Sequence, residues 1–162
     1  MMEGQDDSEW EDDFDVPDSD HHPVLDLELG DRFLTACRNG DTCHVTECLA
    51  SVRVSSHVSS GLVEAARAGH AEVVEMLVTR EECDVNTRDR DGDTPLSHAS
   101  CCGHYAAVKA LLSVPDLDIN TSDLDLVSPL HKAIANNHLD VVELLLKQPS
   151  IKVSRIKFNK KI

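Results

Sequence analysis

The sequence lacks the features of membrane proteins, secreted proteins and nucleic-acid-binding proteins. No apolar run approaches the roughly 18–20 residues that a membrane-spanning helix needs. The N-terminus has neither the basic nor the apolar segment of a secretory signal, so we expect the chain to be cytoplasmic or nuclear. In those reducing compartments its six cysteines are expected to be free thiols.

Positive charge is missing from the first part of the chain. Residues 1–28 hold 12 acidic residues and no lysine or arginine, a net charge of -12, whereas the remainder has 18 acidic and 15 basic residues, a net charge of only -3. Residues 152–162 reverse the trend, with five basic residues and no acidic one. Because nucleic-acid-binding domains present a basic face, this distribution argues against nucleic acid as a partner.

The acidic segment 1–28 is expected to be a disordered arm, because it cannot bury enough apolar surface to offset the cost of ordering. Trp10 and Phe14 are four residues apart, so a transient helix would place them on one side. Acidic segments with spaced aromatic residues can bind partners by coupled folding. The alternative is a solvated tail, which is the commoner use of an acidic run.

The rest of the chain repeats one pattern four times. Each copy begins at a large apolar residue, and the copies are spaced 29, 34 and 34 residues apart: Phe33, Leu62, Leu96 and Leu130. Small residues and turn residues keep the same spacing: Ala36, Ala65, Ala99, Ala133, Gly40, Gly69, Gly103 and Asn137. Such a period is typical of stacked helical repeats, in which neighbouring copies bury faces that one copy cannot bury alone.

Residues at predicted helix ends indicate a short helix pair in each copy. Thr94 and Ser128 are suited to cap the first helix, and the proline after each takes the first helical position, where no N–H is required. Gly103 ends that helix, and Asn137 replaces it in the fourth copy because asparagine tolerates the left-handed conformation.

Two segments resemble ankyrin repeats: DGDTPLSHASCCGHYAAVKALL at 91–112 and SPLHKAIANNHLDVVELLL at 128–146. Both are similar to the family pattern G-x-T-P-L-H-x-A, followed by G-H, V-V, L-L and D-V-N. The resemblance is specific over residues 61–153 and weak over 29–60. Two residues depart from it, because Ser97 stands at the usual histidine position and Leu126 stands where the finger glycine is expected.

The resemblance implies an all-α ankyrin-repeat solenoid of about four helix-turn-helix repeats with short hairpin fingers, preceded by the disordered acidic arm. The first repeat is expected to be a degenerate cap that keeps its helices but loses its finger. The predicted boundaries are 1–28 for the arm, 29–60, 61–89, 90–123 and 124–154 for the repeats, and 155–162 for a basic tail.

Ankyrin repeats are binding scaffolds, so the resemblance implies a non-catalytic monomer without a cofactor that binds a partner protein on its concave face. In the family that face is formed by the fingers and the exposed ends of the inner helices. The matching positions are Arg38, Asn39, Arg67, Arg90, Asp91, Asp93, Cys101, Cys102, Leu124, Asp125, Val127 and Asn136. The alternative is a transcriptional or signalling regulator that acts through Trp10 and Phe14 in the arm, with the repeats as a tether.

Apolar residues gather in the finger that precedes the fourth copy. Leu124, Leu126 and Val127 lie near the predicted loop tip. Exposed apolar clusters often mark contact surfaces, so these residues either contact a partner or pack on a following segment.

The fourth copy has the composition of an internal repeat. A terminal repeat should turn a polar face to water, yet the second helix of this copy is rich in valine and leucine over residues 139–146. Either Ile156, Phe158 and Ile162 fold back as a cap, or the chain is a fragment or short form of a larger protein. The sequence favours the second interpretation, which predicts weak stability at the C-terminal end.

Two cysteine-containing runs were considered as chemical sites. Cys101 and Cys102 precede His104, but this histidine recurs in the neighbouring copies and no carboxylate or second base is placed by spacing, so we expect no enzyme. A second group could supply zinc ligands: Cys37, Cys43, His44 and Cys48. Tetrahedral zinc needs four convergent ligands, and the last cysteine aligns with core leucines of the other copies, so we expect no metal site.

Asn120 follows the run LLSVPDLDI, and the family resemblance implies that an asparaginyl hydroxylase can modify asparagine at this hairpin position. The alternative is that Asn120 only supports the turn through hydrogen bonds from its side chain to the backbone.

Overall fold

The computed structural model describes residues 23–153, which form helices and loops without a strand. The α-helices are α1 (Pro23–Asn39), α2 (Thr42–Leu49), α3 (Val58–Ala68), α4 (Ala71–Val78), α5 (Pro95–Cys102), α6 (Tyr105–Leu112), α7 (Pro129–Ala135) and α8 (Leu139–Leu146), with one 3₁₀ helix, η1 (Val52–His57). None of these helices is both long and apolar enough to cross a bilayer. The residues named above in the arm and the tail, Trp10, Phe14, Ile156, Phe158 and Ile162, lie outside the described range.

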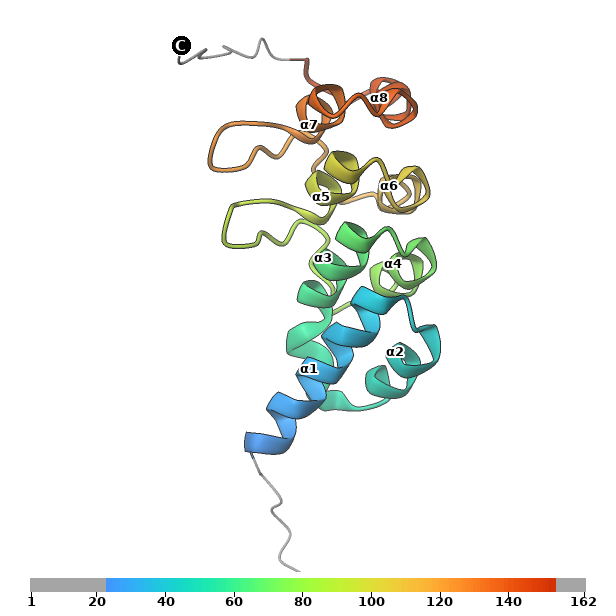
Figure 1. Cartoon of the computed structure of the whole chain (residues 1–162), viewed down its shortest axis with the longest axis vertical. Coiled ribbons are helices and arrows are strands. Elements are labelled where there is room, and N and C mark those ends of the chain that lie inside the picture. The colour runs from blue at the N-terminus through green and yellow to red at the C-terminus, as the bar shows by residue number, and fades with distance from the viewer. Residues whose placement is uncertain (1–22, 154–162) are drawn as a thin grey trace, which may run out of the picture.

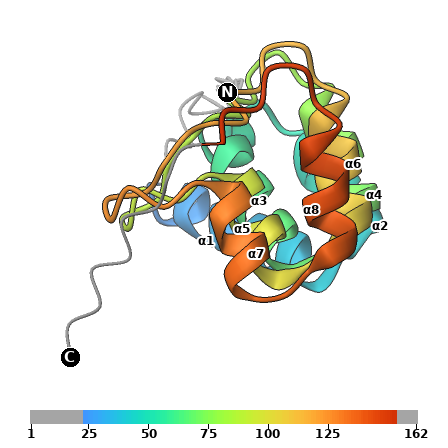
Figure 2. The same cartoon turned by 90° about the horizontal axis from the view of Figure 1, so that it is seen from above.

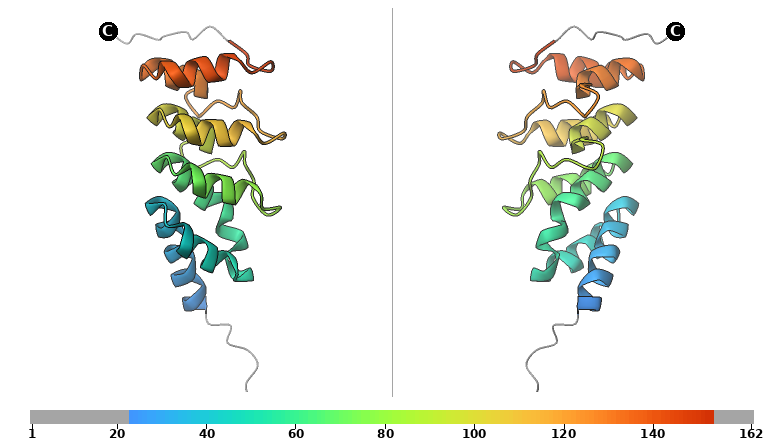
Figure 3. Two further views of the ribbon diagram at one scale, coloured as in Figure 1. Left: turned by 90° about the vertical axis from the view of Figure 1, so that its right-hand side faces the viewer. Right: turned by 90° about the vertical axis from the view of Figure 1, so that its left-hand side faces the viewer.

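The helices form two columns in an elongated stack (Figure 1). The inner column contains α1, α3, α5 and α7, and the outer column contains α2, α4, α6 and α8, as the view along the stack shows (Figure 2). Successive pairs lie one above another with little lateral shift (Figure 3). Two loops project from the inner column: finger A, residues 79–94, and finger B, residues 113–128. This arrangement confirms the predicted all-α solenoid.

The core repeats with the sequence. The large apolar residue that begins each copy is at most 1% exposed: Phe33, Leu62, Leu96 and Leu130. The outer helices add leucine and valine to the same continuous core, since Leu77, Leu111 and Leu145 have no exposed surface. Because helices of about eight residues are marginal in isolation, their stability comes from this packing between copies.

The inner helices begin at the predicted residues. The Thr94 hydroxyl accepts a hydrogen bond from the N–H of Ser97 at 3.2 Å, and Pro95 follows it as the first residue of α5. Ser128 caps α7, where the Nδ1 of His131 lies 2.9 Å from the serine hydroxyl. These caps fix the point at which each finger turns into its helix.

A histidine at the start of three outer helices locks each copy onto the preceding one. The Nε2 atom of His70 lies 3.0 Å from the carbonyl oxygen of Arg38, and that of His104 lies 3.1 Å from the carbonyl oxygen of Arg67. The third contact joins His138 to the carbonyl of Cys101 at 3.0 Å. We call these contacts the histidine ladder.

Glycine is required beneath each step of the histidine ladder. Gly69 has a φ of +83°, and a Cβ there would lie 2.5 Å from the Nδ1 of His104. Gly40 and Gly103 meet the histidines of their own following copies in the same way. In the fourth copy the residue is Asn137, with a φ of 60°, so the left-handed turn is retained but a Cβ is present.

The first copy differs from the predicted boundaries. Helix α1 begins at Pro23 rather than at residue 29, so the end of the predicted arm falls inside a helix. Its C-terminal part buries Phe33 and Cys37 against α3, which explains why the helix belongs to the stack rather than to the arm. Where a finger would follow α2, the chain instead forms η1 and passes directly into α3.

Candidate functional site

An aspartate organises each finger. The Oδ1 of Asp89 accepts hydrogen bonds from the backbone N–H groups of Asp91 (3.0 Å) and Asp93 (2.9 Å) in finger A. In finger B the Oδ1 of Asp123 accepts the corresponding bonds from Asp125 (3.0 Å) and Val127 (2.9 Å). Each finger is therefore a preformed turn with a fixed tip.

The second oxygen of each aspartate bonds to the inner helix behind it. The Oδ2 of Asp89 lies 2.7 Å from the Nε2 of His98 on α5, and the Oδ2 of Asp123 lies 2.8 Å from the Nζ of Lys132 on α7. Lys132 also reaches across to Asp93 of finger A, at 2.5 Å. One half-buried lysine thus ties the two fingers together through two carboxylates.

These contacts change the proton affinities of the groups involved. Burial would raise the pKa of Asp123, but the hydrogen bonds from Lys132 and Val127 outweigh it and hold that pKa below its usual range. Burial would lower the pKa of Lys132, but hydrogen bonds to Asp123 and Asp93 outweigh it and raise that pKa. Asp123 and Lys132 are therefore both ionised at neutral pH, and their ion pair helps to hold finger B in place.

The tip of finger B exposes leucine. Leu124 is 73% exposed and Leu126 is 83% exposed. Leu126 has a φ of 63°, in the left-handed region, at the position that Gly92 occupies in finger A with a φ of 80°. The N–H of Leu124 donates to the carbonyl of Asp91 at 3.3 Å, which joins the two finger tips.

Charged groups surround these leucines. Arg90 and Asp91 are exposed on finger A, and Asp125 is exposed on finger B. The two tips together therefore present the exposed Leu124 and Leu126 along with the carboxylates of Asp91 and Asp125 and the guanidinium group of Arg90. We call this set the finger surface.

The ends of the first two inner helices carry a second charged cluster. Glu64 accepts from the Nε of Arg38 at 2.9 Å and from the side chain of Arg67 at 2.7 Å. Burial would raise the pKa of Glu64, but the two arginines outweigh it and lower that pKa. Both guanidinium groups remain half-exposed, so this end of the inner column is cationic overall.

The remaining predicted contact residues differ in accessibility. Asn39, Cys102 and Asn136 are exposed, whereas Cys101 is half-buried and its Sγ accepts from the Nδ2 of Asn136 at 3.4 Å. Asp93 is also half-buried and bound to Lys132, and Val127 is half-buried at the root of finger B. These last two positions support the finger surface instead of standing at its tip.

Sequence reasoning did not include the residues that hold the fingers. Asp89 and Asp123 are 34 residues apart, and so are His98 and Lys132, so the period contained the signal. The pairing itself is visible only in space, because each aspartate bonds to a helix nine residues further along the chain. Leu126 stands at the finger-glycine position, which is a sequence signal for a left-handed backbone, and the structure gives it a φ of 63°.

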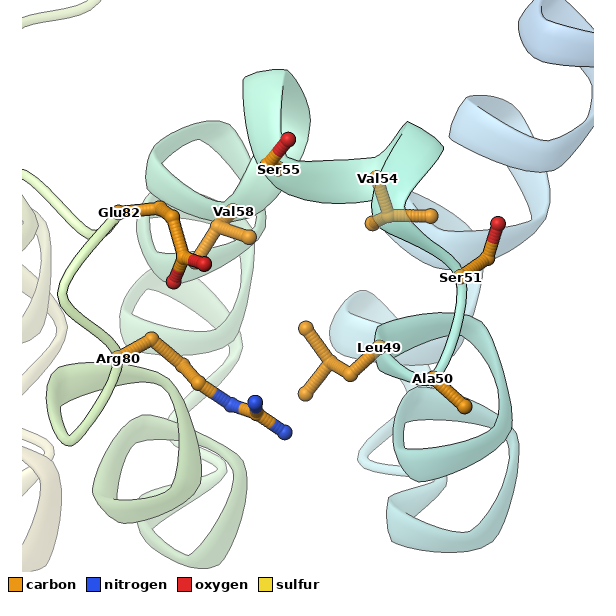
Figure 4. A pocket seen from close by; sticks show the side chains of 8 residues that line it. All are labelled: Leu49, Ala50, Ser51, Val54, Ser55, Val58, Arg80 and Glu82. Atoms are coloured by element: carbon orange, nitrogen blue, oxygen red, sulfur yellow. The ribbon is translucent and has the colours of Figure 1, made fainter.

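A pocket opens where the first finger is missing (Figure 4). It has a volume of about 210 Å³ and lies between η1 and the segment that follows α4. Leu49, Val54 and Val58 form its apolar side, and Arg80 and Glu82 supply one charge of each sign (Figure 4). The two charges offset each other, so the pocket favours no ligand of a particular charge.

Three of the thiols are poorly suited to nucleophilic chemistry, because their pKa values are raised. Burial raises the pKa of Cys37 to about 12 and that of Cys83 to about 11. The pKa of Cys102 is also raised, chiefly by burial. Within residues 23–153 no three histidine, cysteine or acidic side chains are grouped closely enough to hold a metal ion.

Asn120 bonds through both ends of its amide. Its Nδ2 donates to the carbonyl of Ser150 at 2.9 Å, and its Oδ1 accepts from the N–H of Lys152 at 2.7 Å. Asn86, one period earlier, makes the same two bonds to Asp116 and Asp118. The side chain therefore supports the turn, and hydroxylation at Asn120 stays a prediction.

Comparison with known protein families adds to this geometry. A family model of ankyrin repeats (3 copies) matches residues 33–123 and again residues 62–157. The chain belongs to the ankyrin repeat family. No curated protein sequence matches it. Ankyrin repeats generally mediate protein–protein interactions and are typically non-enzymatic.

Proposed function

We propose that this ankyrin repeat protein is a non-catalytic scaffold that binds a partner protein through the finger surface and the adjoining ends of the inner helices. The mechanism is recognition by a preformed surface. Because Asp89, Asp123 and Lys132 already hold the finger tips in place, association costs little further ordering of the chain.

The backbone of Leu126 is the observation that carries this proposal. A left-handed conformation costs an L-residue about 1–2 kcal/mol, and glycine adopts it freely, as Gly92 does in finger A. Leu126 gains no burial in return, since its side chain is 83% exposed. A residue that destabilises its own turn and leaves an apolar group in water is explained by a contact outside the chain.

The chemistry of the surface defines the partner segment that would fit. An apolar side chain would cover Leu124 and Leu126, and a basic group would pair with Asp91 or Asp125, which are exposed beside them. Aromatic or aliphatic anchors in such a centre contribute most of the affinity, while rim charges mainly set specificity. All six cysteines are free thiols, which supports a cytoplasmic or nuclear location for the complex.

The test is affinity capture from cell lysate with three forms of the protein. The Leu124→Asp, Leu126→Gly variant removes the apolar tip, and Leu139→Asp is the control because Leu139 is a similarly exposed leucine, at 68%, on α8. We expect partners that bind the intact chain and the control but not the finger variant. Retention of every partner by the finger variant would contradict the proposal.

A fourth form addresses the alternative function of the acidic arm. Deleting residues 1–22 removes the aromatic residues of the arm and leaves α1 intact, because that helix begins at Pro23. Loss of partners on this deletion alone would favour the regulator that acts through the arm. Retention of partners would leave the finger surface as the binding site.

A further inference from the structure

The C-terminal end of the stack carries exposed apolar surface. At the C-terminal end, apolar side chains stand in water on the side of the fourth copy that faces away from the third. We call this set the end face: Ile134, Val142, Leu146 and Val153.

The end face is a repeat interface without its neighbour. Ile134 is 51% exposed, whereas the three equivalent residues of the other copies, which lie where the next inner helix packs, have no exposure: Cys37, Ala66 and Ser100. Val142 is half-buried, and its equivalents are fully buried: Val45, Val74 and Val108. Val153 is 69% exposed, whereas Val85 and Ile119 are at most 7% exposed.

Hydrogen bonds from Asn120 hold residues 150–152, which lead into the C-terminal residues of the chain. Asn120 holds Ser150 and Lys152 just as Asn86 holds Asp116 and Asp118 one period earlier. After the earlier pair, the chain completes finger B and enters α7, which packs on the third copy. Val153 therefore corresponds to Ile119, after which the chain covers the third copy.

The sequence after Val153 has suitable chemistry. Residues 154–162 contain three apolar residues, Ile156, Phe158 and Ile162, spaced among four basic residues and no acidic one. We propose that residues 154–162 cover the end face, with their apolar side chains against Ile134, Val142 and Leu146 and their basic groups toward water. This inference does not depend on the finger surface.

Two observations separate this occupant from its competitors. A further repeat of the same kind would bring its histidine onto Asn137, where a Cβ stands in place of the glycine hydrogen that the histidine ladder requires. A second copy of the chain would have to associate from solution and lose translational and rotational freedom. Residues 154–162 are covalently joined to the fourth copy through Val153 and do not bear that cost.

The direct test is proton NMR of the full chain. We expect nuclear Overhauser contacts between the δ1 methyl of Ile134 and the ring protons of Phe158, at intensities that do not change with protein concentration. The assignment is tractable because the chain has only three phenylalanines. Absence of contacts from the Ile134, Val142 and Leu146 methyls to residues 154–162 would overturn the proposal, as would contacts found only between different molecules.

Hydrogen exchange with matched variants gives an independent test. Phe158→Asp should accelerate amide exchange in α7 and α8 by tenfold or more, while Asn159→Asp, which adds the same charge one residue away, should change it less than twofold. Exchange in α3 and α4 reports that each variant is folded. Equal effects of the two substitutions, or unchanged exchange in both, would sink the idea that this segment covers the end face.

Discussion

Each histidine of the ladder packs against a glycine, which has only a hydrogen atom where any other residue has a Cβ. That difference decides whether the histidine ring fits. Gly69 has a positive φ and leaves no room for a methyl group beside His104. Replacing Gly69 therefore destabilises the fold in two ways: the positive φ strains any residue with a Cβ, and that Cβ overlaps the ring of His104. Gly92 offers a comparison, since it shares the positive φ but faces only the exposed Leu124.

Gly69→Ala is expected to lower the free energy of unfolding by about 2–4 kcal/mol, from left-handed strain and overpacking combined. Gly92→Ala should lose only about 1–2 kcal/mol, because its Cβ would come no closer than 3.1 Å to the side chain and the backbone N of Leu124, so a small shift accommodates it. Urea unfolding monitored by circular dichroism measures both. Similar losses for the two variants would show that the ring of His104 does not constrain Gly69.

Lys132 is the residue on which both fingers depend. Lys132→Met leaves Asp93 and Asp123 as neighbouring carboxylates without their cation, and removing one partner of a buried pair costs about 3 kcal/mol. The control is Lys147→Met, whose pair with Glu143 is exposed and should change stability little. If both variants unfold at the same urea concentration, the cluster does not stabilise the fingers.

The same carboxylates predict how stability depends on pH. The pKa values of Asp89 and Asp123 are lowered in the folded state, so their contribution is complete above the unfolded pKa of about 3.9 and is lost as the pH falls through the folded values. We expect stability to be nearly constant from pH 7 to about 5 and to decline below about 4. The Asp89→Asn, Asp123→Asn variant should show a shallower decline in acid unfolding curves.

At the scale of elements, finger B has an exposed apolar tip whose left-handed Leu126 lowers the stability of the turn. Leu126→Gly relieves about 1–2 kcal/mol of left-handed strain and adds about 0.4–1 kcal/mol of chain entropy to the unfolded state, so a net gain of up to about 1.6 kcal/mol is expected. Leu124→Gly, where φ is not positive, should destabilise the protein. Thermal unfolding distinguishes the two, and a loss of stability in Leu126→Gly would remove the main support for the finger surface.

Elements were predictable to different degrees for physical reasons. The helix pairs follow from the 34-residue period, because caps such as Thr94 and buried residues such as Leu96 act locally and recur. The start of α1 at Pro23 was not predicted, because the acidic residues before position 29 lie outside the repeated pattern that marks the other helices. The role of Asp93 was also missed, because its bond to Lys132 joins residues 39 positions apart.

On the scale of the whole molecule, stability should vary along the stack. The helices α5 and α6 have neighbours on both sides, whereas α7 and α8 pack against a complete copy on only one side within the described residues. We expect amide exchange to be slowest in α5 and α6 and at least tenfold faster in α8, even when residues 154–162 cover the end face. Exchange in residues 138–150 as slow as in the third copy would contradict this gradient.

The histidine ladder has a consequence for how such a chain can change in length. Its joints are alike, since each places a histidine ring on a glycine and against a carbonyl of the preceding inner helix. Loss of residues 90–123, one whole period, would leave Asp89 directly before Leu124 and bring His138 onto Gly69 in the place of His104. The number of repeats can therefore change with little loss of stability. Duplication or deletion of a whole period forms the same histidine–glycine contact that the other repeats already make.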